Sequence, residues 1–248
     1  MLERLHNIHI VLVEPSGPRN VGSIARVMKN MGLAHLILIN PQCDYVGDEA
    51  RQMAVHAADI LEQAQRFDTL AEGLAGRFRV IATTARSRHH NLEAEPPRVA
   101  LPWLLDQPSA LIFGREASGL TNQELEFAQR IVTLPVDASY ASLNLAQAVG
   151  ICSYELRQIC LEAGPPAQDS PWSTGTASRV PFEALEDYFQ HLEQVLCAIG
   201  YLYPHTAASR MQKFRQIYKR SQLTPQELAM LRGILRQTEW AIHRITPS

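Results

Sequence analysis

The chain has 248 residues, enough for one large domain or for one domain with an appendage. Hydrophobic residues make up 46% and charged residues 19%, an ordinary globular balance, and no apolar run approaches the ~20 residues needed to cross a bilayer. The short N-terminal apolar stretch is followed by no small-residue cleavage site. We therefore expect a cytoplasmic protein without a signal peptide and without a membrane partner.

Strand patterns alternate with helical patterns along the first 162 residues, which predicts an α/β fold with a parallel sheet. The run IHIVLV is typical of a strand buried on both faces. The strands are expected at 8–13, 36–40, 78–84, 110–113 and 131–135. The helices between and after them are expected within 20–32, 48–63, 68–75 and 143–162.

Residues 163–179 are rich in Pro, Gly, Ser and Thr and have no apolar period, which indicates a linker. Three helical patterns follow near 181–200, 206–221 and 224–243. A helix start is clear at 224–227: Thr224 is the N-cap, Pro225 lies in the first turn, and Glu227 is at the glutamate position of a capping box.

The net charge of −2 does not indicate a nucleic-acid partner, but the cations are unevenly distributed along the chain. Residues 77–92 carry four arginines and no acid, and residues 206–223 carry five cations and no acid. Such stripes suit an anionic polymer, although a solvated helix face explains them equally simply. The four cysteines have neither C-x-x-C nor zinc spacing, so we expect structural thiols and no metal site.

The first motif, NVGSIARVMKNMG at 20–32, opens a helix directly after the first strand, where ligands bind in α/β sheets. Asn20 is a natural N-cap and Gly32 a natural stop. Gly22, Arg26 and Lys29 are expected opposite the apolar face, so Arg26 should project away from the core. From periodicity alone, a plain surface arginine is the better interpretation.

The second motif, LIFGREASGLTN at 111–122, takes a buried strand into a loop with two glycines and an adjacent Arg115–Glu116 pair. Thr121 and Glu124 predict a capping box for the next helix. An ordinary turn explains the glycines but not the charges at a buried strand end, and both interpretations stay open.

The third motif spans residues 134–149, where a loop with hydroxyl side chains enters a long apolar helix. The start of that helix offers unpaired N–H groups and a partial positive charge. Simple capping by Ser142 or Asn144 explains either residue in isolation. The chain has no G-x-G-x-x-G after the first strand, no Walker lysine motif, no G-x-S-x-G elbow and no H-E-x-x-H.

The order of the three motifs resembles the SpoU branch of the SPOUT methyltransferases. The forms NVGSIARVMKNMG, ATTARSR, LIFGREASGLTN and YASLNLAQAV are similar to the TrmJ subgroup, as is the tail with GYLYP and LRGIL. The resemblance covers essentially the whole chain apart from the linker and residues 89–100.

This resemblance implies a SPOUT domain at 1–162 with a C-terminal trefoil knot, a linker at 163–179 and a helical, tRNA-contacting extension at 180–248. Pattern alone would not predict a knot, because knots are very rare. The family binds S-adenosyl-L-methionine (SAM) in the knot largely through backbone groups. The positions that match those of the family are Thr83, Thr84, Ala85, Gly114, Leu134, Ala141, Ser142 and Leu143. The resemblance also implies a homodimer whose active site is completed across the interface.

The implied reaction is an in-line attack of a ribose 2'-hydroxyl oxygen on the SAM methyl carbon, with S-adenosylhomocysteine leaving and no metal required. The resemblance assigns catalysis to Arg26 and Ser142. Because a guanidinium is essentially always protonated, we interpret Arg26 as a phosphate holder and oxyanion stabiliser rather than a general base. Expected contacts to the RNA are Asn20, Arg86, Arg88, Arg115, Glu116, Asn144, Lys213, Arg215 and Lys219.

The implied substrate is nucleotide 32 of the tRNA anticodon loop, a cytidine, with uridine left open. An enzyme that modifies the 2'-hydroxyl must receive RNA rather than DNA. Two alternatives stay open: the same chemistry on ribosomal RNA, and a SAM- or RNA-binding module without catalysis. The sequence does not decide which tRNA species are bound, or whether the tail clamps tRNA or only packs.

Overall fold

The computed structural model describes residues 2–85, 93–137, 139–162, 180–221 and 223–245. The chain divides into two compact units, an N-terminal unit of residues 1–168 and a C-terminal unit of residues 169–248. The division falls within the segment 163–179, the predicted linker, which lies outside the described residues.

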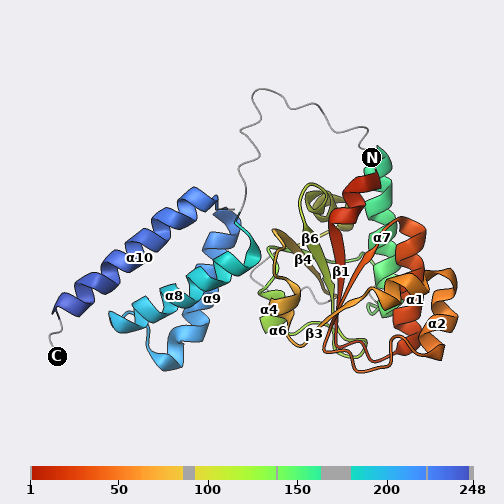
Figure 1. Cartoon of the computed structure of the whole chain (residues 1–248), viewed down its shortest axis with the longest axis horizontal. Helices are drawn as coiled ribbons and strands as arrows, with labels where there is room; N and C mark the ends of the chain where they lie inside the picture. The colour runs from red at the N-terminus through yellow and green to blue at the C-terminus, as the bar shows by residue number, and fades with distance from the viewer. Residues whose placement is uncertain (1, 86–92, 138, 163–179, 222, 246–248) are drawn as a thin grey trace. The chain divides into compact units, whose positions relative to one another are not determined.

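The N-terminal unit is built on a seven-stranded sheet in the order β3-β2-β1-β6-β4-β7-β5, with every neighbouring pair parallel (Figure 1). The strands are β1 Ile8–Val13, β2 His35–Ile39, β3 Gln65–Phe67, β4 Arg79–Thr83, β5 Ala94–Glu95, β6 Ser109–Phe113 and β7 Arg130–Val132. The predicted α/β class and its five strands are confirmed. The two unpredicted strands, β3 and β5, are too short to show a period.

Helices cover both faces of this sheet. One face carries α1 Pro18–Met31, α2 Asp48–Ala54, α3 Ala58–Glu62 and α7 Leu145–Glu162, whose apolar side chains share one core with β1, β2 and β6. On the other face, α4 (Leu70–Gly73) packs Gly73 against Ile37 and Ile39 of β2. The remaining short helices are η1 Leu2–Asn7, η2 Val55–Ala57, α5 Pro97–Ala100, η3 Leu101–Leu104 and α6 Asn122–Leu125.

Helix α1 begins earlier than predicted. Its N-cap is Gly17, and Pro18 occupies the first turn, where its missing N–H is not needed. The expectation that Asn20 caps the helix is therefore wrong, and its side chain is free for other contacts. Gly32 ends α1 with φ 83°, as expected of a left-handed C-terminal glycine.

The face of α1 predicted to lie opposite the core is only partly exposed. Arg26 is exposed, as predicted, but Gly22 is buried against α2. A Cβ at Gly22 would lie 2.1 Å from the carbonyl oxygen of Ala50, so only glycine allows α1 and α2 to approach this closely. Lys29 forms an ion pair with Asp59 of α3 at 2.7 Å.

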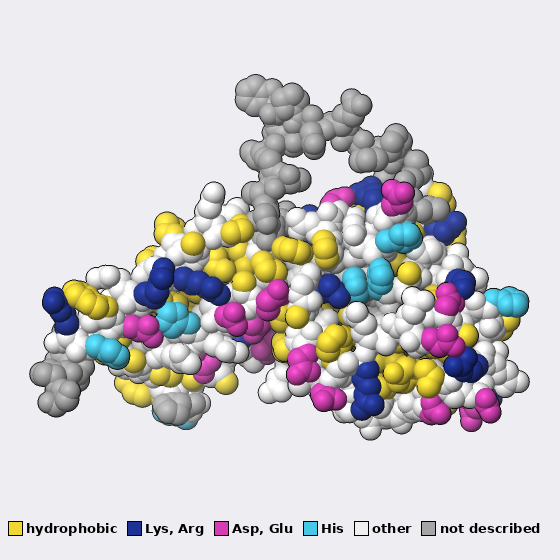
Figure 2. Space-filling view, viewed as in Figure 1, with side chains coloured by type: hydrophobic (Ala, Val, Ile, Leu, Met, Phe, Trp, Pro, Cys, Tyr) yellow, Lys and Arg dark blue, Asp and Glu magenta, His cyan; other side chains and the backbone are white. Residues whose placement is uncertain are grey.

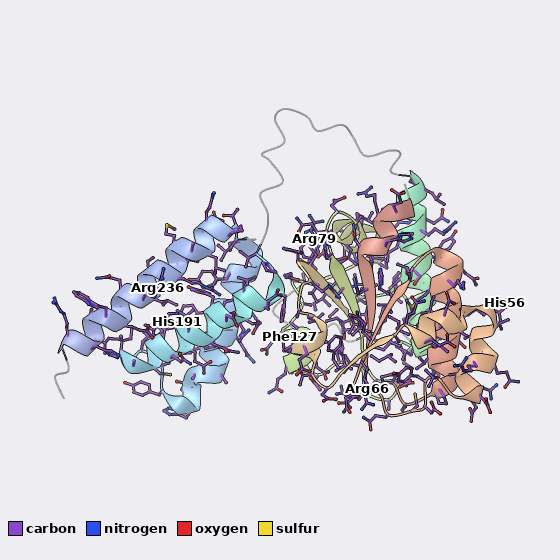
Figure 3. All side chains as sticks on the ribbon, in the orientation of Figure 1. His56, Arg66, Arg79, Phe127, His191 and Arg236 are labelled. Atoms are coloured by element: carbon purple, nitrogen blue, oxygen red, sulfur yellow. The ribbon has the colours of Figure 1, made fainter. Side chains whose placement is uncertain are left out.

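The first of the two predicted basic stripes is not a surface stripe over its described part. Arg79 is 8% exposed, donates to the carbonyl of Trp103 and lies 3.6 Å from Asp106 (Figure 3). Acidic and basic side chains alternate over the visible face of the N-terminal unit (Figure 2). No described helix is both long and apolar enough to span a bilayer.

The C-terminal unit consists of three helices, α8 Phe182–Ala198, α9 Pro204–Ser221 and α10 Pro225–Ile245, which confirms the predicted helical extension. Its core includes Tyr188 and Phe189 of α8, and Phe214 and Tyr218 of α9 pack against it. The predicted start of α10 is also confirmed, because Glu227 accepts from the Thr224 N–H at 2.8 Å and donates its own N–H to the Thr224 hydroxyl.

Candidate active site

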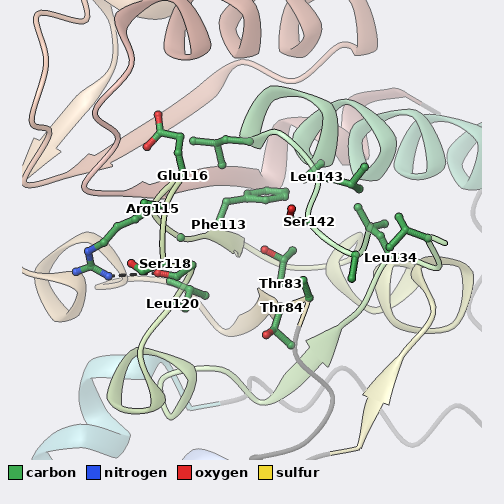
Figure 4. Close-up of a pocket in the computed structure, with 18 of the residues that line it drawn as sticks. Thr83, Thr84, Phe113, Arg115, Glu116, Ser118, Leu120, Leu134, Ser142 and Leu143 are labelled. Carbon is green, nitrogen blue, oxygen red and sulfur yellow. Dashed lines mark hydrogen bonds between the residues drawn. The ribbon is translucent and has the colours of Figure 1, made fainter. Parts of the chain in front are cut away.

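A pocket opens at the carboxyl ends of β4, β6 and β7, the edge where parallel sheets bind ligands (Figure 4). Its volume is about 200 Å³, which suits a small organic ligand rather than a single water molecule. Three loops line it, after Thr83, after Phe113 and after Val132, together with the start of α7. The lining includes Thr83, Thr84, Ala85, Gly114, Leu134, Ala141, Ser142 and Leu143, the whole set proposed from the resemblance.

The described pocket wall is mostly apolar side chains and backbone. Phe113, Val132 and Val136 contribute apolar surface that the motifs did not single out. The Thr83 hydroxyl donates to the carbonyl of Ile112 at 2.9 Å, so it is already used inside the fold. The signal for Phe113 was its place as the last residue of a buried strand, which points it to the ligand-binding edge.

Gly114 is required by the tight loop that follows β6. A Cβ at this position would lie 2.2 Å from the carbonyl carbon of Gly119 and 2.3 Å from the Leu120 nitrogen. Gly119 itself has φ +70°, in the left-handed region that favours glycine. The glycines therefore hold backbone close to backbone at the pocket rim.

Arg115 is held by carboxylates of its own chain. Its guanidinium donates to Glu14 at 2.7 Å and, through two nitrogens, to Glu124 at 2.9 and 3.0 Å. These hydrogen bonds, first to Glu14 and then to Glu124, raise the pKa of Arg115. Glu14, which directly follows β1 and has φ 46°, was not predicted as a partner of Arg115. Arg115 thus ties β1 to the 114–120 loop.

Glu116 binds the start of α1. Its carboxylate accepts from the backbone N–H and hydroxyl of Ser16, from the Gly17 N–H at 3.0 Å and from the Asn20 side-chain amide at 3.2 Å. Partial burial raises the pKa of Glu116, but these hydrogen bonds outweigh it and the net pKa is lowered. A charged Glu116 therefore joins the 114–120 loop to the first turn of α1.

Asn144 extends this network to α7. Its side-chain oxygen caps the helix by accepting from the Ala146 N–H at 2.9 Å, and its amide donates to the Asn20 side-chain oxygen at 3.1 Å. Asn20 thus stands between Glu116 and Asn144, and the three motifs of the sequence meet at one point. Of the two expected caps, Asn144 is the one used, while Ser142 is exposed and lines the pocket.

Two family models cover most of the chain. The model described as SpoU rRNA Methylase family matches residues 7–154, and the model described as tRNA methyltransferase TrmJ, C-terminal domain, matches residues 183–246. The chain is 39% identical to the tRNA (cytidine/uridine/adenosine-2'-O-)-methyltransferase TrmJ of Pseudomonas aeruginosa, over 95% of both chains. It is 40% identical to the tRNA (cytidine/uridine-2'-O-)-methyltransferase TrmJ of Klebsiella pneumoniae, over 95% of this chain and 97% of the relative.

The chain belongs to the TrmJ family of SpoU methyltransferases. The crystal structure of TrmJ from Z. mobilis has the same fold, with a TM-score of 0.80, 32% identity and coverage of 93% of this chain and 98% of that one. The resemblance stated from the motifs is thereby confirmed. The pocket lies in the part of the chain that matches the SpoU model, as does the network of Asn20, Glu116 and Asn144. Helices α8–α10 correspond to the part that matches the TrmJ C-terminal domain.

The other expected site residues are not gathered at the pocket. Arg26 is exposed on α1 and is not among the described residues that line the pocket of its own chain. Arg86 and Arg88 lie outside the described residues, as does the side chain of Lys219. Lys213 is exposed, whereas Arg215 is engaged with Glu186 and lies 4.7 Å over the Phe189 ring.

No cluster of three or more His, Cys, Asp or Glu side chains that could bind a metal occurs in the described part of the chain. The four cysteines are unpaired; Cys152 and Cys160 lie on the buried face of α7, in the core. Burial, and then the nearby Glu155, raise the pKa of the Cys152 thiol to about 12, as befits a packing residue.

Proposed function

We propose that this protein is a SAM-dependent tRNA 2'-O-ribose methyltransferase that acts on nucleotide 32 of the anticodon loop. The observation that carries the proposal is the pocket, which brings together all eight expected cofactor positions in a chain of TrmJ length and sequence. Cytidine and uridine are the proposed bases, since both relatives are named for them. A cytoplasmic location goes with a tRNA substrate.

The pocket's chemistry fits SAM. Its described walls are mostly apolar side chains and backbone, and the two charged side chains among them, Arg115 and Glu116, are already bound by groups of the same chain. A ligand held there relies largely on backbone groups and apolar contact, which suits an adenosine with a short polar tail. SAM supplies a methyl carbon on a positively charged sulfur, so no metal is needed to activate the leaving group.

Within this proposal, the chain's residues align and deprotonate the ribose. Ser142, exposed at the pocket, orients the 2'-hydroxyl or a water that takes its proton. Arg26 holds the adjacent phosphate and stabilises the negative charge that develops on the 2'-oxygen. Asn20 and Asn144 fix the α1 and α7 termini around the substrate.

The active form proposed is a homodimer in which Arg26 of one protomer completes the pocket of its partner. Two observations support it: Arg26 is exposed away from its own pocket, and α7 carries an exposed apolar stripe. Ile151, Tyr154 and Leu161 are 40%, 49% and 48% exposed at spacings of three and seven residues, on one helical face. Such a stripe suits packing against a second copy.

The trefoil knot belongs to the same proposal. Strand β7 lies beyond β4, whereas α7 packs against α1, which covers the sheet near β1. The segment between them must therefore cross the carboxyl edge of the sheet past the 114–120 loop. Threading of this segment through a larger loop of the chain is the path that fits a SPOUT fold.

Ribosomal RNA is the second candidate substrate, because the model that matches residues 7–154 is described by that name. The test is to incubate total RNA from a strain that lacks the gene with purified protein and SAM, and to map new 2'-O-methyl groups. We expect a new methyl group in tRNA at nucleotide 32. New methyl groups in ribosomal RNA alone would favour the second candidate, and none in either RNA would favour a binding module without catalysis.

A further inference from the structure

The outward face of α10 carries an aromatic side chain between two arginines. Arg236, Trp240 and Arg244 follow one another at four-residue intervals, so they lie on one stripe of the helix. All three are exposed, and Trp240 is 51% exposed. Leu228 and Leu235 are buried on the opposite side of the helix. Packing within the C-terminal unit therefore does not account for the position of the indole.

The two arginines of this stripe have no acidic partner among the described residues. The Arg244 guanidinium lies 4.3 Å from the centroid of the Trp240 ring. Within the described part of the chain, neither Arg236 nor Arg244 forms an ion pair with a carboxylate. Figure 3 shows Arg236 on α10, and Figure 2 shows basic and hydrophobic side chains next to one another over this helix.

The cations of α9 are used differently. Arg215 forms an ion pair with Glu186 and covers the Phe189 ring, and Arg210 donates to the carbonyl of Tyr201 at 3.0 Å while lying over its ring. These arginines stabilise the unit itself. Of the α9 cations whose side chains the structure describes, Arg210 and Lys213 are exposed, and Lys213 is the one without such a contact within the described residues.

Gly233 leaves the helix backbone uncovered on this stripe, so that a binding partner can approach it closely. It lies in the middle of α10, where alanine would favour the helix more, and a Cβ there would meet nothing within 4 Å. Contacts within the chain do not require a glycine at this position. The bare backbone lies three residues before Arg236, on the outward side.

We propose that Gly233, Arg236, Trp240 and Arg244, the α10 stripe, bind an unpaired nucleotide of the tRNA substrate. A base stacks on the Trp240 indole, and the flanking phosphates lie at Arg236 and Arg244. An exposed aromatic side chain beside cations is how proteins hold single-stranded RNA, because every base has a stacking face and every nucleotide a phosphate. The inference rests on the proposed function for the identity of the RNA.

The test uses the full-length protein and a fluorescein-labelled transcript of a tRNA, with anisotropy measured over a range of salt. Trp240→Leu removes the stacking face but stays apolar, and Trp240→Phe keeps it. We expect Trp240→Leu to weaken binding about tenfold and Trp240→Phe to retain most of the affinity. The double variant Arg236→Gln/Arg244→Gln should flatten the plot of log affinity against log salt by roughly 0.7 to 0.9 for each lost contact.

The matched charge control is Arg66→Gln in β3, an exposed arginine of the N-terminal unit that should leave affinity near that of the wild type. Melting temperature and oligomeric state are measured for each variant. Unchanged affinity and salt slope in both Trp240→Leu and the double arginine variant, with a wild type that methylates tRNA, would overturn the α10 stripe alone. If Trp240→Leu and Trp240→Phe bind tRNA equally well but change the oligomeric state or the melting temperature, the stripe contacts protein rather than RNA. That result would also overturn the proposal. If the wild-type protein neither binds nor methylates tRNA, the proposed function itself is wrong, and the proposal for the stripe is wrong with it.

Discussion

Arg26 is the residue on which the proposed chemistry depends most. It is exposed on α1, so Arg26→Ala should leave the melting temperature and SAM binding close to those of the wild type. Methyl transfer should fall by about 10² to 10³, the usual effect of losing one preorganised charge contact. Arg26→Lys should also remain poor if two parallel hydrogen bonds to phosphate are needed. Single-turnover transfer from tritiated SAM measures both, and near-normal turnover in Arg26→Ala would return this arginine to a plain surface residue.

His9 makes the stability of the N-terminal unit depend on pH. Burial, then Arg77 and the stacked His35 ring 4.7 Å away, lower its pKa to about 4, and His35 in turn faces His6. The unfolded chain takes up this proton near pH 6.5. The contribution of His9 to the free energy of unfolding is therefore complete above that pH and is lost as the pH falls toward 4. The loss should reach roughly 1 kcal/mol at pH 5.5 after allowance for solvent screening.

The control for this pH effect is His9→Phe, which keeps a ring beside His35 but cannot titrate. Urea unfolding at pH 7.5 and 5.5 gives the free energy of unfolding for both proteins. The difference between the two pH values should shrink in the variant. An identical pH dependence in wild type and variant would show that another group carries it.

At the scale of elements, the 114–120 loop shapes the pocket through Gly114. Since a Cβ there would lie 2.2 Å from backbone, Gly114→Ala should displace the loop and weaken SAM binding at least tenfold in calorimetry. Gly150→Ala is the matched control: its Cβ would meet only the Val27 side chain at 3.9 Å, so α7 should tolerate it. Equal SAM affinity in the two variants would mean that the loop relaxes and does not set the pocket.

Local sequence patterns predict single elements of this fold, but not the contacts between elements that are distant in the chain. The buried strands and the capping boxes at Thr121 and Thr224 follow from local spacing, and they were predicted correctly. The roles of Arg115 and Glu116 depend on Glu14 and Ser16, about a hundred positions away, which no local pattern reveals. Gly22 was misplaced for the same reason, because only the packing of α2 shows that its face is buried.

At the scale of the whole molecule, the proposed dimer can be tested by mixing two inactive variants. Arg26→Ala lacks the arginine, and Gly114→Ala is expected to lack a working pocket. If Arg26 serves the partner's pocket, co-expression should give mixed dimers with one intact site, which recover activity up to about half that of the wild-type dimer. Dimers that stay inactive, with both variants folded and dimeric by light scattering, would place Arg26 and the pocket in the same chain.

The most direct test of the central claim is methyl transfer to two tRNA transcripts that differ in a single oxygen. One transcript carries ribose at every position, and the other carries 2'-deoxyribose at nucleotide 32 only. With the purified protein and tritiated SAM, we expect about one methyl group per molecule of the first transcript and none on the second, because the attacking hydroxyl is missing. Equal labelling of both transcripts would contradict methylation of the 2'-oxygen of nucleotide 32.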